Sequence, residues 1–333
     1  VGIQSRLVAF GLVDKGRWTI RQLGAAIKHA NYDTIKVNDD LMIKPIDGFG
    51  NPELLRFVLA TERPDVLLLF TDPRFFEAVW SLEDEIHQVC PIAYWHLWDS
   101  VEFPPDFNRP IYESVDLINC INYPTYEFCK SRWPDKTNFI PHSVADIYRP
   151  LPEEDCKRYK HQLLNGKCDD HFVAVWVNRN ARRKQPGDIL LSWKLFLDKL
   201  EAAHGHRKAT LIMHTDPYDK EGTNLFVVAD MLGIKGNVFF STARFEFEQM
   251  NVLFNISDIA VTTSSAEGHG IMTHEAMQCG KPIVALAVGG LRRQVIDHRD
   301  GFEHGVALEP DVTTLSGSQQ VPYIADYYVT QEK

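Results

Sequence analysis

Short apolar runs rich in β-branched and aromatic residues recur along the chain, separated by longer amphipathic stretches. Runs that are apolar at every position are typical of strands covered by helices on both faces of a parallel sheet. Their alternation with helical stretches predicts an α/β fold built from doubly wound parallel sheets. The runs lie at residues 66–70, 92–95, 117–120, 172–176, 210–213, 238–240, 259–261 and 283–286.

The length of the chain predicts more than one domain. Its 333 residues exceed one compact core and favour two α/β domains of about 150 residues each. Composition shifts from strand-like to linker-like at residues 140–146, and the polar, proline-containing stretch 149–155 follows. We therefore predict two Rossmann-like domains, 1–143 and 144–333, that face each other across a cleft.

Charge and cysteine usage narrow the class of protein. A net charge of −10 disfavours nucleic acid as a partner of the whole surface. Six cysteines without a CxxC pair favour reduced thiols over a zinc ribbon or a disulfide scaffold. No apolar run reaches the roughly 18 residues of a membrane helix, and the first residues lack a signal-peptide pattern. These features predict a cytoplasmic protein, and a peripheral contact of the first domain with the inner face of a membrane stays open.

The segment 264–282 is the most informative part of the sequence. It is expected to form a strand end, a glycine-punctuated loop and a helix that starts near Gly270 and stops at Gly280, with Pro282 blocking continuation. Gly268 and Gly270 let the backbone approach a ligand closely, and the first helical amides favour an anion such as a diphosphate. The segment therefore predicts a phosphate seat.

Two glutamates flank this predicted phosphate seat. On a helical period Met272, Ala276 and Cys279 form one apolar stripe, and Glu275 lies beside it. A partly buried carboxylate needs hydrogen-bond donors, which the vicinal hydroxyls of a ribose supply. Glu267, ahead of the helix, is expected to face the same cleft near a sugar. The pair would bracket one nucleotide sugar.

The run EGHGIMTHEAMQCGKPIVA, with its E-x7-E spacing, resembles the donor-site signature of the retaining glycosyltransferases of family four, which have the GT-B fold. The resemblance implies that Glu267 contacts the transferred sugar and Glu275 the ribose hydroxyls. It also implies that the backbone amides of Ile271 and Met272 hold the phosphates. His269 stands where the family usually has an aromatic residue.

A basic cluster at residues 178–184 follows the apolar run 172–176. Cations after a strand end can neutralise a diphosphate, although such runs are also common on solvated surfaces. Arg179 and Lys184 are similar in placement to the family's Arg and Lys, which hold the donor phosphates and stabilise the leaving diphosphate. Arg183 could take the place of either one.

The resemblance is specific across residues 172–305 and looser before them. In the first half, His96 resembles a histidine that the family places near the transferred sugar, and Gly16 lies in the region of the family's glycine-containing first loop. More helix is expected after a loop at residues 289–290, so the chain is expected to be truncated or to end irregularly over residues 323–333.

These observations predict a retaining, metal-independent glycosyltransferase without a cofactor. Its donor would be a UDP- or GDP-hexose, and its acceptor a glycan, lipid or small molecule that the sequence does not identify. A sugar-nucleotide epimerase, a phosphorylase or a non-catalytic nucleotide-sugar-binding protein of the same fold are the alternatives. The spacing Gly11-x4-Gly16 and the following Arg17-Trp18 disfavour a dinucleotide oxidoreductase and a P-loop enzyme.

Overall fold

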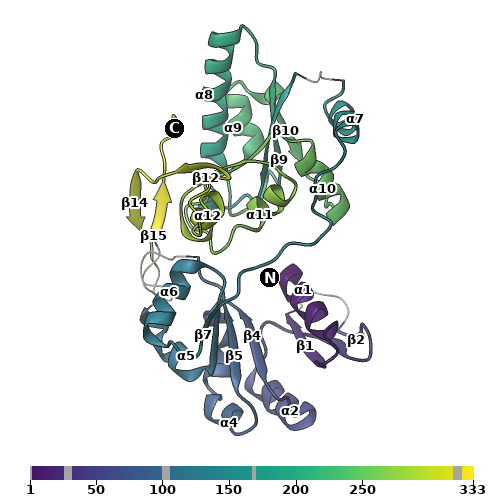
Figure 1. Ribbon diagram of the computed structural model, residues 1–333, viewed down its shortest axis with the longest axis vertical. Coiled ribbons are helices and arrows are strands. Elements are labelled where there is room, and N and C mark those ends of the chain that lie inside the picture. The colour runs from purple at the N-terminus through teal and green to yellow at the C-terminus, as the bar shows by residue number, and fades with distance from the viewer. Residues whose placement is uncertain (1, 26–31, 100–105, 167–169, 318–324) are drawn as a thin grey trace. The chain divides into compact units, whose positions relative to one another are not determined.

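A computed structural model describes residues 2–25, 32–99, 106–166, 170–317 and 325–333 (Figure 1). The chain divides into two compact units. The first comprises residues 1–98 and 104–143, and the second comprises residues 144–333 with the short segment 99–103.

The first unit contains two separate sheets among its described residues. Strands β4, β5, β6 and β7 form a fully parallel sheet in that order, while β1 and β3 pair in parallel and β2 joins β3 antiparallel. The elements are α1 (Gly2–Val13), β1 (Ile20–Ala25), β2 (Ile35–Lys36), β3 (Leu41–Ile46), α2 (Pro52–Glu62), β4 (Leu67–Thr71), η1 (Pro73–Phe76), α3 (Glu77–Trp80), α4 (Glu83–His87), β5 (Ile92–His96), η2 (Asp106–Asn108), α5 (Arg109–Ser114), β6 (Leu117–Cys120), α6 (Tyr123–Arg132) and β7 (Thr137–Phe139).

The predicted loop between Gly11 and Gly16 is helical as far as Val13, whereas Gly16 itself lies in a turn, and its contact with the donor stays a prediction. Gly11 lies within helix α1, and Gly16 follows the end of this helix in a turn with φ of +65°. The helix is held by Gln4, whose buried side-chain amide donates to the carbonyl oxygen of Ser143 (2.7 Å) and accepts from its amide (3.2 Å). This long-range pair of bonds holds a helix where the family resemblance implied the start of a loop.

The second unit is a doubly wound sheet of six parallel strands in the order β10-β9-β8-β11-β12-β13. The order reverses between β8 and β11, which is where ligands bind in open α/β sheets. The elements are α7 (Glu153–Leu163), β8 (Phe172–Val177), η3 (Arg182–Lys184), α8 (Pro186–His204), β9 (Ala209–His214), α9 (Leu225–Met231), η4 (Lys235–Asn237), β10 (Val238–Ser241), α10 (Phe247–Asn255), β11 (Ile259–Thr262), α11 (Ile271–Gln278), β12 (Ile283–Leu286), α12 (Gly289–Val295), β13 (Gly305–Leu308), β14 (Val312–Leu315) and β15 (Ala325–Tyr328).

Strand β8 is apolar at every position because helices cover both faces of the sheet. Val173 and Val175 pack into one core with residues of α10 and α11, whereas Ala174 and Trp176 pack into a second core with residues of α8 and α9. Successive side chains of a strand point to opposite faces. A continuous apolar run is therefore what this central position requires.

All eight apolar runs form strands, which confirms the secondary-structure prediction for β4, β5, β6, β8, β9, β10, β11 and β12. Residues 289–290 begin helix α12 instead of forming a loop, so that expectation is wrong. The part of the predicted C-terminal segment that the structure describes contains strand β15, which pairs antiparallel with β14.

The described cysteines carry free thiols, as the sequence predicts, and four of the five are buried; Cys168 lies outside the described residues. None of the helices that the structure describes is long and apolar enough to cross a bilayer.

Candidate functional site

Helix α11 begins at Gly270, as predicted, and only glycine fits there. Gly270 has φ of +85°, and an added Cβ would lie 2.4 Å from Cδ2 of Leu291 and 2.8 Å from Oγ1 of Thr273. No side chain caps the helix, so its first amides, including those of Ile271 and Met272, are free of a capping side chain. Uncapped amides together with the helix dipole favour an anion at this position.

Helix α12 supports the loop ahead of α11 from one side. The amide of Gly290 donates to the carbonyl oxygen of Glu267 (3.0 Å), and the side-chain amide of Gln294 donates to that of Gly270 (3.0 Å). A Cβ on Gly290 would lie 2.5 Å from the carbonyl oxygen of Gly268 and 2.6 Å from Cα of His269. Gly290 is therefore required for this close approach, and the loop has a fixed backbone.

Glu275 is a buried carboxyl group on α11. It is 8% exposed, beside the buried stripe of Met272, Ala276 and Cys279. Burial raises the pKa of Glu275 from 4.5 to about 7, and a hydrogen bond from the Tyr148 hydroxyl opposes this rise in part. A carboxylate in such surroundings gains from further hydrogen-bond donors, because a buried charge with few partners is costly.

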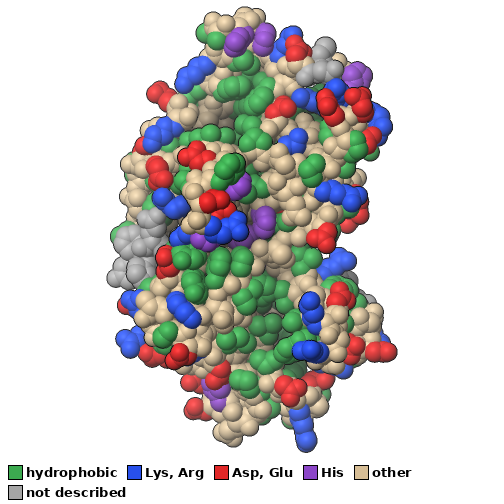
Figure 2. Space-filling model, viewed as in Figure 1, with side chains coloured by type: hydrophobic (Ala, Val, Ile, Leu, Met, Phe, Trp, Pro, Cys, Tyr) green, Lys and Arg blue, Asp and Glu red, His purple; other side chains and the backbone are tan. Residues whose placement is uncertain are grey.

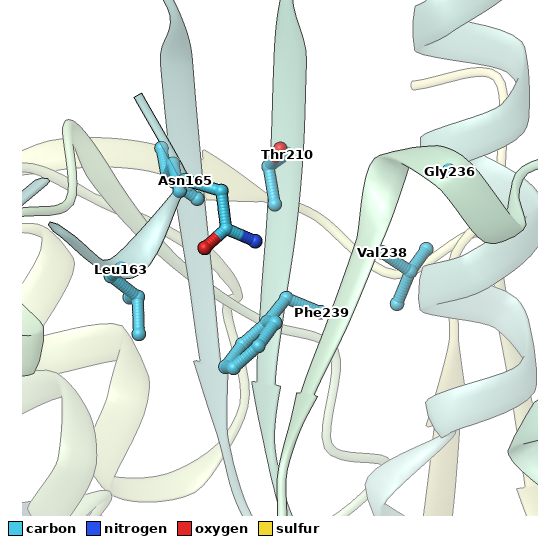
Figure 3. A pocket seen from close by; sticks show the side chains of 7 residues that line it. Leu163, Asn165, Thr210, Gly236, Val238 and Phe239 are labelled. Carbon is cyan, nitrogen blue, oxygen red and sulfur yellow. The ribbon is translucent and has the colours of Figure 1, made fainter. Parts of the chain in front are cut away.

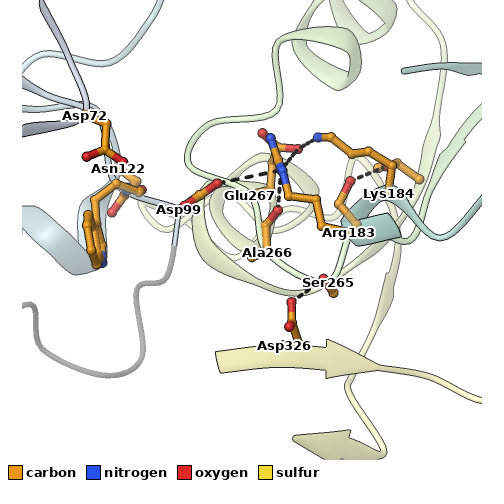
Figure 4. Close-up of polar contacts among 12 residues, drawn as sticks. Asp72, Asp99, Asn122, Arg183, Lys184, Ser265, Ala266, Glu267 and Asp326 are labelled. Carbon is orange, nitrogen blue, oxygen red and sulfur yellow. Dashed lines mark hydrogen bonds and ion pairs between the residues drawn. The ribbon is translucent and has the colours of Figure 1, made fainter. Parts of the chain in front are cut away.

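The predicted residues Lys184 and Glu267 meet in one ion pair (Figure 4). Lys184 ends the short η3 helix after β8, and Glu267 lies in the loop before α11. Arg183 joins them, with Nη1 3.7 Å from Oε2 of Glu267 and donating to the carbonyl oxygen of Ala266 at 2.8 Å. Two cations therefore adjoin one carboxylate at the carboxyl end of the sheet.

Opposite effects act on the ionisation of this pair. Burial alone would raise the pKa of Glu267, but Lys184 and Arg183 outweigh it and hold the pKa below its ordinary value. Burial lowers the pKa of the Lys184 amine, and the attraction of Glu267 offsets this in part. Glu267 is therefore ionised at neutral pH.

Arg179 takes part in a different cluster. Its guanidinium donates to both carboxylate oxygens of Asp219 (2.7 and 3.1 Å) and lies 3.3 Å from Glu221. More than half of the side chain is exposed. The structure thus places Arg183, not Arg179, at Glu267, and the role of Arg179 with donor phosphates stays a prediction.

Three buried polar atoms near the carboxyl ends of neighbouring strands lack hydrogen-bond partners among the described residues. They are Nδ2 of Asn178 after β8, Oγ1 of Thr215 after β9 and Oγ1 of Thr263 after β11. Unsatisfied buried polar groups are rare in native proteins and call for a ligand or water. The cluster at residues 178–184 includes Asn178 but gives it no role, and sequence reasoning missed Thr215 and Thr263, because Thr is common after strands and only the order of the strands in the sheet brings these residues together.

His96 lies at the end of β5 but is fully buried within the first unit. Its Nε2 pairs with the Tyr112 hydroxyl at 3.0 Å, and it stacks on Trp98. Burial lowers the pKa of His96 to about 3, so the ring is neutral. The aromatic core encloses the ring, and its contact with a sugar stays a prediction.

His96 also belongs to a cluster with Cys120 and Cys129, in which the nearest ligand-type atoms all lie within 4.8 Å of one another. It is the one group of three such residues found in the described part of the chain. The sequence predicts no metal, and this prediction stays untested.

The surface of the second unit carries mixed charge over α11 and α12, where Lys or Arg, Asp or Glu, and His side chains gather (Figure 2). A hollow elsewhere in this unit lies at the amino ends of β9 and β10, which is the wrong end of the sheet for the site described above (Figure 3). Its lining includes Leu163, Asn165, Thr210, Val238 and Phe239.

Comparison with known proteins gives a family match for the second unit. Residues 165–311 match the model of "Glycosyl transferases group 1". A trehalose synthase of Pyrococcus horikoshii is 39% identical over 131 residues, which cover 39% of this chain and 28% of that protein. A D-inositol 3-phosphate glycosyltransferase of Mycolicibacterium smegmatis is 38% identical over 165 residues, 48% of this chain and 36% of that protein. The chain thus spans about a third of the length of these curated relatives.

Solved structures extend the likeness to the first unit at the level of fold. A sucrose-phosphate synthase from Thermosynechococcus elongatus superposes with a TM-score of 0.70 and 16% identity, covering 93% of this chain and 80% of that one. HepE of Anabaena, in complex with UDP and glucose, gives a TM-score of 0.61 and 19% identity over 81% of this chain and 72% of that one. The predicted GT-B fold is confirmed.

Proposed function

We propose that this protein transfers a sugar from a nucleoside-diphosphate sugar to an acceptor. The proposal starts from the match of residues 165–311 to the group 1 glycosyl transferases. The observation that carries the proposal is one cluster in the second unit. The loop that leads into the uncapped start of α11 carries Glu267, which is paired with Lys184 and Arg183. Glu275 lies in the second turn of α11 itself.

The donor diphosphate is assigned to the first amides of α11 and to the two cations. Breaking the bond between the anomeric carbon and the diphosphate oxygen leaves negative charge on the departing group and oxocarbenium character on the sugar. Lys184 and Arg183 stabilise that charge with groups of the chain itself, so the proposed reaction is metal-independent. Removing one such preorganised group typically costs about 3 to 4 kcal/mol of barrier.

We assign the two glutamates different roles, because their surroundings differ. Glu275 accepts hydrogen bonds from the ribose hydroxyls, which would offset its burial. Glu267 is ionised beside its cations and contacts the transferred sugar. Retention of the anomeric configuration rests on the E-x7-E resemblance, and a UDP-hexose is the first donor to test because HepE was solved with UDP and glucose.

The proposal is tested by following donors by NMR. Purified protein is incubated with UDP- and GDP-hexoses and with panels of glycan, lipid and small-molecule acceptors. We expect consumption of one donor, release of the nucleoside diphosphate and a product that keeps the donor's anomeric configuration. Inversion would refute the retaining mechanism, release of an epimer would indicate an epimerase, and binding without consumption would indicate a non-catalytic binder.

Two site variants and two control variants test whether the transfer activity depends on the proposed site. Lys184→Ala and Glu275→Ala should each lower turnover or donor affinity. Lys235→Ala and Glu154→Gln change exposed residues elsewhere in the same unit and should leave both unchanged. Equal behaviour of all four variants would place the donor elsewhere.

A further inference from the structure

Strand β15 runs along the loop that carries Glu267. The amide of Tyr327 donates to the carbonyl oxygen of Ser265 at 3.0 Å. The Ser265 hydroxyl donates to Oδ1 of Asp326 at 2.6 Å (Figure 4). One backbone bond and one side-chain bond thus hold the residue that lies two positions before Glu267.

The same strand also holds the turn that carries Lys184. The side-chain amide of Gln185 donates to the carbonyl oxygen of Tyr327 at 2.9 Å. Loop and turn are joined directly as well, because the amide of Ser265 donates to the carbonyl oxygen of Arg183 at 2.7 Å. These bonds close a ring through β15, the Ser265 loop and the Arg183–Gln185 turn.

The ring is buried and anchored in the core of the second unit. Ser265 is 1% exposed, and Gln185 and Tyr327 are also buried. Ala325 and Tyr327 belong to the core cluster that contains Met272 and Ala276 of α11. Buried hydrogen bonds hold geometry firmly because breaking them leaves desolvated polar groups without partners.

We propose that β15 is a positioning element for the Lys184–Glu267 pair, with Ser265, Asp326 and Gln185 as the positioning residues. The hydrogen bonds that link these three residues to the loop and the turn end on backbone atoms or on one another, so each acts through the backbone that presents the pair. Strand β15 lies beyond residue 311, where the family match ends. The chain therefore supplies this support from its own C-terminal residues.

This inference rests on the proposed function for its kinetic part. Displacing a catalytic group by about 1 Å can lower turnover on the order of 100-fold. Because the Lys184 charge is retained, we expect Asp326→Ala and Ser265→Ala to lower kcat by about 10- to 100-fold and to raise KM for the donor by less than the roughly tenfold expected for Lys184→Ala. Asp326→Asn keeps an acceptor oxygen for Ser265 and should restore most of the activity.

A control variant next to β14 separates positioning from general damage. Asp311 accepts from the amide of Thr330 and pairs with Lys333, both of which follow β15, and these contacts do not involve Ser265. Asp311→Ala should keep kcat. A loss of kcat in Asp311→Ala equal to that in Asp326→Ala would overturn the proposal, as would full activity of Asp326→Ala.

Amide hydrogen exchange keeps the proposal testable without any activity. Relative to wild type, Asp326→Ala should speed exchange at Ser265 and Gly290, whose amides lie in or against the loop, and leave the strand β9 unchanged. Faster exchange together with no transfer by the wild type would support the positioning role and reject the proposed function. Unchanged exchange at Ser265 would overturn the positioning role, whatever the activity.

Discussion

The two units place ionisable side chains at the carboxyl ends of parallel strands in opposite ways. In the second unit, Lys184 and Glu267 form an ion pair beside Arg183, close to an uncapped helix start. In the first unit, His96 is enclosed by aromatic rings and bonded to Tyr112. A strand end becomes a candidate site where paired charges adjoin the half-exposed Arg183 and an uncapped helix start, and it becomes core where one neutral ring is enclosed.

Substitution of Lys184 is expected to have the largest effect on turnover. Lys184→Ala should lower kcat by about 100- to 1,000-fold, because the leaving diphosphate loses a preorganised cation. Steady-state kinetics with a UDP-hexose measures this, with Lys235→Ala as the matched control. A decrease below about threefold would contradict the assignment of the leaving-group role.

Glu275 should make donor affinity depend on pH. Its pKa of about 7 means that the carboxylate which accepts the ribose hydroxyls is mostly protonated at pH 6 and ionised at pH 8. We expect the affinity for a UDP-hexose to rise by about tenfold over this range and the rise to vanish in Glu275→Gln. Calorimetric titration at both pH values measures it; an equal rise in the variant would exclude Glu275 as its source.

Glu275 should also make the stability of the fold depend on pH: the unfolding free energy should fall as pH rises, whereas donor affinity rises. The pKa of Glu275 is raised from 4.5 in the unfolded chain to about 7, so its contribution is fully present below pH 4.5 and is lost as pH rises through 7. Relative to Glu275→Gln, the wild type should lose about 2 to 3 kcal/mol of unfolding free energy between pH 5 and pH 8. Urea unfolding at the two pH values measures this difference, and a gain instead of a loss would contradict the raised pKa.

His96 should affect stability more than donor binding. His96→Ala removes a buried ring that contacts Tyr94, Trp98 and Tyr112, and we expect a loss of about 2 kcal/mol of unfolding free energy. Donor affinity, which we assign to the second unit, should stay unchanged by calorimetry. A large loss of affinity in a folded variant would remove the contrast between the units.

The smallest effect is expected at Arg179. Asp219 and Glu221 already engage its exposed guanidinium, so Arg179→Ala should change donor affinity by no more than about threefold. Arg183→Ala, measured beside it, should have the larger effect. A larger loss of donor affinity in Arg179→Ala than in Arg183→Ala would indicate that Arg179 binds the donor phosphates.

Local patterns in the sequence predict the second unit well. Continuous apolar runs predict strands such as β8, and the glycines around α11 predict where the helix begins and ends, because both depend on residues close in sequence. The sequence also identifies Lys184 and Glu267 as site residues, but it does not predict that they pair, because the adjacency of β8 and β11 is visible only in the structure.

Long-range contacts explain what the sequence could not predict. Gln4 holds α1 through Ser143, and Asp326 reaches Ser265, and no local pattern encodes partners so far apart. The choice between Arg179 and Arg183 depends on which acidic residues the fold brings near, here Asp219 and Glu267. The burial of His96 depends in the same way on rings from other elements.

Titration calorimetry with a UDP- and a GDP-hexose tests the central claim most directly. We predict that one of them binds the wild type at one site per chain, that Lys184→Ala and Glu275→Ala weaken binding by at least about tenfold, and that Lys235→Ala binds like the wild type. Absence of binding to the wild type, or equal binding by all four proteins, would contradict a donor site at the start of α11.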